Sequence, residues 1–229
     1  MIEDPPLLAI RRGFARPSPA QLAAFAGMPT GYVVDALGGR GALSNAIRPL
    51  PGVPAAFSGP ILTCACGPAD NLALFGAVSA ARKGDVIFAS SDAFAGVALT
   101  GDLLLGMAKN AGVVALVTDG LARDQAGIRG VGLPVHCAGV SPNSPARNGP
   151  GEVGLPIVIG GVAVAAGDIA VADEDGVVVV PFARIDATIR RLAEVRAAEA
   201  ILEAKVKEGL IVPEFIRKSI EAGRFKDVE

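Results

Sequence analysis

The first half of the chain alternates between segments with helix signals and short runs with strand signals. Residues 113–118 form a continuous apolar run, so this strand is expected to be buried on both faces. Ser18-Pro19-Ala20-Gln21 has the pattern of a capping box with proline at the first helical position. Helices interleaved with apolar strands predict βαβ packing. The expected helices are 18–26, 30–37 (capped by Thr30), 70–82 and 101–110, and the expected strands are 62–66, 86–89 and 113–118.

The second half has a different pattern. From residue 133 to 181, many glycines and prolines separate short β-branched runs, which indicates closely spaced strands in a β-layer or a small barrel. Apolar positions in rough heptad spacing predict one long helix over 183–208, ended by Gly209. The expected strands are 157–159, 162–164, 169–171 and 177–180.

The composition is apolar, with 51% hydrophobic residues and a mean hydropathy of +0.48. However, the longest apolar stretch, residues 157–167, contains three glycines and is about half the length of a membrane-spanning helix. The amino terminus lacks the pattern of a signal peptide, so we expect a cytoplasmic protein with no membrane partner. The apolar excess then favours surface buried between subunits. The net charge of −2, without a basic stripe, argues against a nucleic-acid partner.

Several classes of site are excluded or disfavoured by what the chain lacks. Cys64, Cys66 and Cys137 are an odd number, which argues against a disulfide framework and leaves core packing as the default. His136 is the single histidine, so multi-histidine metal sites and a hydrolase triad are disfavoured. Residues 149–154 match the spacing of a dinucleotide-binding loop but do not lie between a strand and a helix.

The segment from Thr100 to Asp124 is the strongest candidate for a functional site. Thr100 can cap the helix over 101–110, whose first-turn N–H groups would then be free to bind an anion. Arg123 and Asp124 follow the buried strand, where α/β sheets place their ligand sites. The structural alternatives are that Asp102 only stabilises the helix dipole and that Arg123–Asp124 is a surface ion pair. If the two loops face one cleft, they combine N–H donors, a guanidinium and carboxylates suited to Mg²⁺ or Mn²⁺.

Nine short segments carry a resemblance to a known family: 34–36, 70–71, 83–86, 101–104, 119–124, 149–152, 160–161, 167–168 and 173–181. By these segments the chain resembles the RraA-like proteins, which include 4-hydroxy-4-methyl-2-oxoglutarate/4-carboxy-4-hydroxy-2-oxoadipate aldolases. The similarity runs from about residue 30 to 181. It implies a single RraA-like domain over 1–229, an α/β/β sandwich with a long C-terminal helix, and a helical extension over 183–229 used in subunit packing. It also implies assembly as a homotrimer or homohexamer with sites between subunits.

The resemblance also implies functional roles for individual residues. The amides from Gly101 through Asp102 and Leu103 to Leu104 would bind the carboxylate of a pyruvyl group. Arg123 would contact the substrate and stabilise an enolate, while Asp124 would ligate Mg²⁺, Mn²⁺ or another divalent cation. Glu199 of a neighbouring subunit would contact metal-bound water. The base would then be this water, polarised by Asp102 or Glu199. The loops over 142–145 and 149–152 are closer to a broad RraA-like subgroup than to the best-studied aldolases.

The leading hypothesis is therefore a divalent-metal-dependent (class II) aldolase, which cleaves a 4-hydroxy-2-oxo acid such as 4-hydroxy-4-methyl-2-oxoglutarate to pyruvate. Decarboxylation of oxaloacetate needs the same enolate and is expected as a second activity. The alternative is an RraA-type protein-binding regulator of ribonuclease activity without catalysis. A methyltransferase is disfavoured because no glycine-rich loop between a strand and a helix is available for S-adenosylmethionine.

Overall fold

The computed structural model describes residues 6–226 and 228 and divides into two compact units, residues 1–192 and 193–229. A nine-stranded sheet organises the first unit, and its central strands run parallel in the order β3-β4-β6-β8. This confirms the βαβ packing expected from the sequence. The outer strands β1, β10 and β2 extend the sheet at its two sides. The bounds are β1 Leu8–Ile10, β2 Arg48–Pro49, β3 Phe57–Ala65, β4 Val86–Ser90, β6 Ala115–Thr118, β8 Val135–Cys137 and β10 Gly151–Val153.

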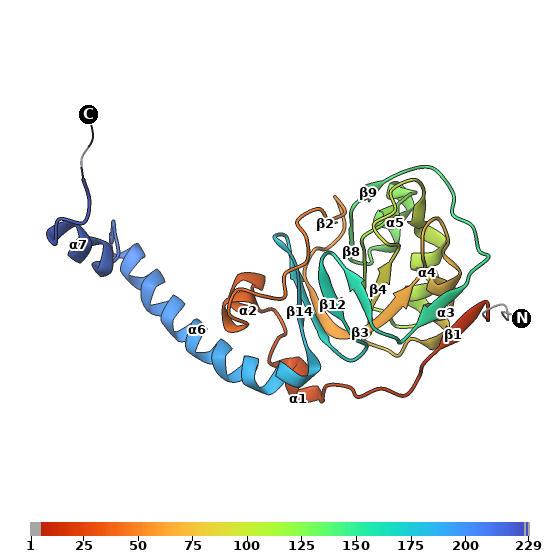
Figure 1. Cartoon of the computed structure of the whole chain (residues 1–229), viewed down its shortest axis with the longest axis horizontal. Coiled ribbons are helices and arrows are strands. Elements are labelled where there is room, and N and C mark those ends of the chain that lie inside the picture. The colour runs from red at the N-terminus through yellow and green to blue at the C-terminus, as the bar shows by residue number, and fades with distance from the viewer. Residues whose placement is uncertain (1–5, 227, 229) are drawn as a thin grey trace, which may run out of the picture. The chain divides into compact units, whose positions relative to one another are not determined.

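Three helices cover one face of this sheet, as Figure 1 shows: α3 (Leu72–Ala80), α4 (Asp102–Asn110) and α5 (Gln125–Val131). Their apolar side chains meet one set of strand residues in a continuous buried core. Representative members of this core are Leu62, Leu74, Ile87, Leu105, Leu116 and Ile128.

Two antiparallel hairpins cover the opposite face of the parallel strands: β11 (Ile157–Ile159) with β12 (Val162–Val164), and β13 (Ile169–Asp173) with β14 (Gly176–Val180). The second hairpin belongs to the nine-stranded sheet, because β13 pairs with β3. The long strand β3 joins the layers, because its first half pairs with β13 and its second half with β4. A second core lies between the hairpins and the alternate strand residues. Its members include Ile61, Phe88, Val117, Ile159, Ala170 and Val179. The expected α/β/β sandwich is therefore confirmed, with the second half forming a β-layer rather than a small barrel.

Helix starts differ in detail from the expectations. The capping box of Ser18 and Gln21 is present on α1 (Pro19–Ala23). Thr30 does not cap α2 (Thr30–Ala36) but lies inside it, and its N–H and hydroxyl both donate to Asp173, at 2.8 Å each.

Thr100 does not cap α4 either. Thr100 is the last residue of β5 (Ala98–Thr100), and Gly101 is the N-cap of α4. Because glycine has no side chain, α4 has no side-chain cap hydrogen bond.

The predicted C-terminal helix is present as α6 (Ile185–Lys207), 23 residues long, preceded by the 3₁₀ turn Phe182–Arg184. Ile185, Thr188 and Leu192 are buried within the first unit. The second unit contains the rest of α6 and the helix α7 (Glu214–Glu221), with ion pairs such as Glu203–Lys207 at 2.6 Å. None of the described helices is long and apolar enough to cross a membrane.

Candidate functional site

A small parallel sheet brings the two predicted loops together. It consists of β5, β7 (Leu121–Ala122) and β9 (Gly139–Val140), in that order. Because β5 leads into α4 and β7 leads into α5, both helices start at the same edge. The Arg123 N–H donates to the Thr100 carbonyl at 3.0 Å, which fixes the two loops to one another. Arg123 and Asp124 thus follow the short strand β7, and not directly the strand over 113–118 as expected.

The two helix starts line one cavity of about 160 Å³, and all six substrate-site and metal-site residues predicted between 101 and 124 contribute to it. The expectation that the two loops face a common cleft is met in this geometry. The roles assigned to the residues remain predictions. These residues are Gly101, Asp102, Leu103, Leu104, Arg123 and Asp124.

Two glycines allow the carboxylates of the cleft to approach opposite helices. A methyl group at Gly101 would lie 2.6 Å from Oδ2 of Asp124, so the Asp124 carboxylate rests on the N-cap of α4. Conversely, a methyl group at Gly127 in α5 would collide with the carboxylate of Asp102. The Asp124 carboxylate therefore contacts the start of α4, and the Asp102 carboxylate contacts the first turn of α5. Gly127 was not predicted, because its packing role depends on a residue 25 positions away.

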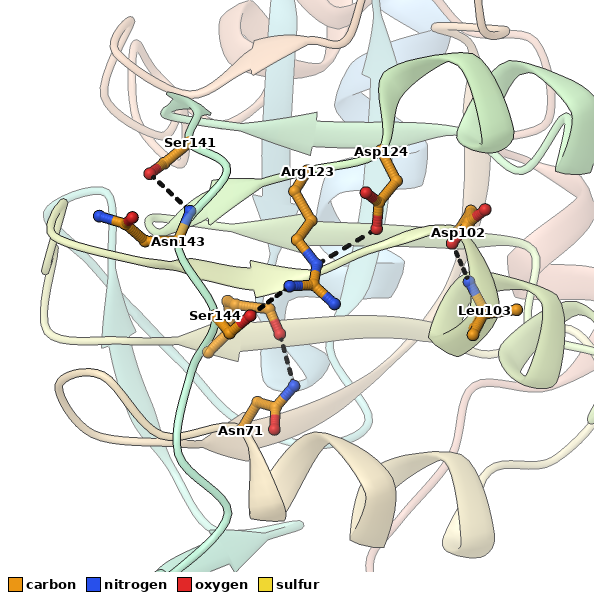
Figure 2. A network of polar contacts seen from close by, with 9 residues as sticks. Asn71, Asp102, Leu103, Arg123, Asp124, Ser141, Asn143 and Ser144 are labelled. Atoms are coloured by element: carbon orange, nitrogen blue, oxygen red, sulfur yellow. Dashed lines mark hydrogen bonds and ion pairs between the residues drawn. The ribbon is translucent and has the colours of Figure 1, made fainter.

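Arg123 is held between a carboxylate and a hydroxyl. Its Nε lies 3.2 Å from Oδ2 of Asp124, and its Nη1 donates to Oγ of Ser144 at 2.5 Å, as Figure 2 shows. The Arg123 and Asp124 side chains are 34% and 44% exposed, so both can still reach a ligand. Asp124 adopts a left-handed conformation with φ of 60°. Such a conformation costs about 1 kcal/mol or more for a residue with a side chain, and it often marks functional positions.

The start of α4 is a partial anion site. The first helical bond runs from the Leu105 N–H to the Gly101 carbonyl, so the preceding amides of Asp102, Leu103 and Leu104 lie in the unpaired first turn. However, the Leu103 N–H donates to Oδ1 of its neighbour Asp102 at 2.7 Å (Figure 2). A ligand carboxylate that binds the Leu103 amide must therefore compete with the Asp102 side chain.

Sequence reasoning did not predict the other wall of the cleft. It contains Asn71 and Phe75 of the α3 region, and Arg147 from the loop that follows β9. The Asn71 Nδ2 donates to the Leu99 carbonyl at 2.9 Å (Figure 2). The Asn71 Oδ1 and the Thr100 hydroxyl are buried and have no hydrogen-bond partner among the described residues. Such atoms are costly and require a function or a bound water. The Asp70-Asn71 pair was the only sequence signal for this wall.

The donor set of the cleft fits a hard divalent cation better than zinc. Asp102 and Asp124 offer carboxylate oxygens, and Mg²⁺ is commonly bound by one or two carboxylates with several waters. Among the described residues, no group of three or more His, Cys, Asp or Glu side chains is placed to hold a metal. Glu199 lies on the part of α6 that belongs to the second unit, so its predicted role stays a prediction.

The histidine and the three cysteines are buried and do not line the cleft. His136 is buried, its Nε2 lies 3.2 Å from the Asp173 carbonyl, and burial lowers its pKa. The sulfurs of Cys64 in β3 and Cys66 just after it lie 3.4 Å apart, and burial raises the pKa of Cys64 well above its usual value. Cys64 and Cys66 belong to the buried core, and His136 does not line the cleft.

Comparison with known proteins agrees with this architecture. A model of the Aldolase/RraA family matches residues 30–179. A Halalkalibacterium halodurans protein named "Putative 4-hydroxy-4-methyl-2-oxoglutarate aldolase" is 32% identical over 187 residues, covering 82% of this chain and 89% of that protein.

Two solved structures have the same fold. An uncharacterized protein from Pseudomonas syringae pv. tomato has a TM-score of 0.74 at 23% identity, covering 86% of this chain and 96% of its own. The RNA-processing inhibitor RraA from Thermus thermophilis has a TM-score of 0.62 at 28% identity, covering 67% and 93%. Together with the match over residues 30–179, these relatives show that the chain belongs to the Aldolase/RraA family.

Proposed function

We propose that this protein is a divalent-metal-dependent lyase that cleaves a 4-hydroxy-2-oxo acid, such as 4-hydroxy-4-methyl-2-oxoglutarate, to pyruvate. We propose further that the same site decarboxylates oxaloacetate. The observation that carries the proposal is the cleft in which Arg123, Asp102 and Asp124 meet the start of α4. The H. halodurans relative, by its name, supports the same reaction.

Each group in the cleft suits one requirement of the retro-aldol reaction. The Leu104 amide at the start of α4, joined by that of Leu103, would bind the C1 carboxylate. Arg123 would donate to the 2-oxo oxygen and stabilise its negative charge as the enolate forms. Asp124 would hold Mg²⁺ or another divalent cation, which supplies Lewis-acid stabilisation of the same oxygen when bound.

Bond cleavage requires a base at the C4 hydroxyl. Asp102 would accept that proton, directly or through water, with Glu199 of a neighbouring subunit as a second carboxylate for this task. The C3–C4 electron pair then moves toward C3 to give the pyruvate enolate, and a carbonyl forms at C4. Protonation of C3 completes pyruvate. With oxaloacetate, loss of carbon dioxide from C4 leaves the same enolate.

The proposal includes self-association as a homotrimer or homohexamer, a cytoplasmic location, and no nucleic-acid or membrane partner. Several large apolar side chains of the second unit are exposed, as expected for surface used in subunit packing. Examples are Ile201, Val206, Ile211 and Phe215. Size-exclusion chromatography with light scattering tests this part, and a monomer would remove the intersubunit role of Glu199.

The activity is tested by coupling pyruvate release to lactate dehydrogenase, with 4-hydroxy-4-methyl-2-oxoglutarate and with oxaloacetate. We expect turnover with Mg²⁺, loss of turnover in EDTA, and a fall of at least about 100-fold in kcat/KM for Arg123→Met and Asp124→Asn. Asp175→Asn is the matched control, since this exposed side chain makes no hydrogen bond to the described residues. Metal-independent turnover, or full activity of Asp124→Asn, would contradict the mechanism.

A second candidate function is an RraA-type regulator that binds a ribonuclease without catalysis, as the T. thermophilis relative suggests. A pure binding protein has no need for two carboxylates and an arginine in one cleft, which favours the lyase. Specific binding of a ribonuclease, combined with no turnover of either substrate, would support the regulator instead.

A further inference from the structure

The candidate cleft contains a second guanidinium group. Arg147 lines the cleft together with Arg123, and its Cζ lies 5.5 Å from the centre of the Phe75 ring. The two arginines differ in their partners. Arg123 has Asp124 at 3.2 Å, whereas no carboxylate of the described residues lies within ion-pair distance of Arg147. The positive charge of Arg147 is therefore available to an anionic ligand.

The loop that carries Arg147 is fixed from within the protein. The buried carboxylate of Asp70 accepts the N–H groups of Asn148 at 2.5 Å and Gly149 at 3.1 Å, directly after Arg147. On the other side of Arg147, the backbone pairs with residues 69–71. Hydrogen bonds thus hold the chain on both sides of Arg147, so its Cα has a defined position at the cleft.

The same loop also contacts the first arginine. Ser144 accepts a hydrogen bond from Arg123, and Figure 2 shows the loop passing beside the Arg123 side chain. One segment therefore carries Arg147 and contacts the group proposed to bind the 2-oxo oxygen. Phe75 and Met107 add apolar surface to the cleft.

We propose that Arg147 is a specificity-determining residue that binds the second carboxylate of a dicarboxylic 2-oxo acid. This inference rests on the proposed function, in which the α4 start and Arg123 bind the C1 carboxylate and the 2-oxo oxygen. A guanidinium matches a carboxylate with two parallel hydrogen bonds, and it discriminates strongly against a methyl group, which offers no acceptor. The alternative is that Arg147 only packs on Phe75 as a surface cation–π pair.

Matched ligands that differ only at the far carbon separate these explanations. 2-Oxoglutarate and 2-oxopentanoate have the same chain length, and neither carries the 4-hydroxyl needed for cleavage. Their binding is measured by calorimetry with Mg²⁺ present. The cleavable pair is 4-hydroxy-2-oxoglutarate, which would give pyruvate and glyoxylate, and 4-hydroxy-2-oxopentanoate, which would give pyruvate and acetaldehyde. The variants are Arg147→Met, Arg147→Lys and, as a control outside the cleft, Arg40→Met.

We expect the unmodified protein to bind 2-oxoglutarate more tightly than 2-oxopentanoate. Arg147→Met should weaken 2-oxoglutarate binding by about 10- to 100-fold, the range for a hydrogen bond to a charged group, and leave 2-oxopentanoate within about threefold. Arg147→Lys should recover part of the difference, and Arg40→Met should change neither. The kcat/KM values of the cleavable pair should follow the same pattern.

The outcomes distinguish this inference from the proposed function. No preference for 2-oxoglutarate in the unmodified protein, or a preference that survives Arg147→Met, would overturn the role of Arg147. A preference that depends on Arg147, without turnover of either cleavable substrate, would support Arg147 as the carboxylate-binding residue and count against the lyase.

Discussion

Two glycines on α5 provide a direct test of how Asp102 is placed. Gly127 and Gly130 both lie inside the helix. A methyl group at Gly130 would meet nothing within 4 Å, whereas one at Gly127 would lie 2.7 Å from both Cβ and Cγ of Asp102. The two Gly→Ala substitutions are therefore chemically identical, but only the methyl group at position 127 would clash with Asp102.

The expected magnitudes follow from these contacts. Replacing a helical glycine by alanine normally stabilises a protein by about 0.5–1 kcal/mol, which we expect for Gly130→Ala. In Gly127→Ala, rotation about χ1 cannot relieve the clash, because the Asp102 Cβ is attached directly to the backbone of α4. The two helix starts must separate, and overpacking of this kind costs about 1–3 kcal/mol. The net result should be a destabilisation of up to about 2 kcal/mol.

The effect on activity should be larger than the effect on stability. A displacement of about 1 Å at a catalytic group can cost about 100-fold in rate, so Gly127→Ala should lose much of its pyruvate release. Gly130→Ala should retain it.

Urea unfolding followed by circular dichroism gives the free energies, since the chain has no tryptophan for fluorescence. If Gly127→Ala were as stable and as active as Gly130→Ala, the Asp102 carboxylate would not rest against α5 and the reasoning would fail.

Two further predictions concern buried titratable groups away from the cleft. Arg16 pairs with the fully buried Asp85 at 2.5 Å. Arg16→Met should therefore lower the free energy of unfolding in urea by about 3 kcal/mol, because it leaves a buried carboxylate without its partner. The control is Arg12→Met, which should change this free energy little, because Arg12 has no ion pair among the described residues. Burial lowers the pKa of His136 in the native state, so this histidine's contribution to stability should be complete above about pH 6.5. As the pH falls from there through the native pKa, the contribution should be lost, because the unfolded chain takes up the proton first. Because His136 is the single histidine, its NMR titration is unambiguous, and a midpoint above about 6.5 would contradict the burial argument.

The parts of the fold that follow from local sequence patterns were predicted well. The strands of the β-layer, the buried strand β6 and the capping box of α1 each depend on neighbouring residues, and the structure contains all of them. Errors occur where a tertiary contact outweighs a local preference. Thr30 has the side chain of a helix cap, yet the carboxylate of Asp173 binds it from 143 residues away. Thr100 could cap α4, but pairing of β5 with β7 holds it in a strand.

The residues of the candidate cleft also fall into those that local sequence patterns predict and those that depend on tertiary contacts. Arg123, Asp102 and Asp124 could be predicted because charged groups beside helix starts and strand ends have recognisable chemistry. Gly127 and Arg147 could not, because a glycine in a helix and an arginine in a loop occur in most proteins. Their significance comes from packing against Asp102 and Phe75, which lie 25 and 72 positions away in the sequence.

Asp70 has one contact within its own segment of the sequence and others with a distant loop. The contacts with the loop could not be predicted from neighbouring residues. Asp70 lies one residue before Asn71, the N-cap of α3, and its Oδ1 accepts the Leu72 N–H at 2.8 Å. The other oxygen, Oδ2, binds the backbone of the loop at Asn148 and Gly149. One buried carboxylate thus orders both the helix that carries Phe75 and the loop that carries Arg147. The wall of the cleft that contains Phe75 and Arg147 therefore depends on a residue that does not line the cleft. If Arg147 binds substrate as proposed, substrate selection would depend on the anchoring of this loop by Asp70 as well as on the groups that contact the ligand.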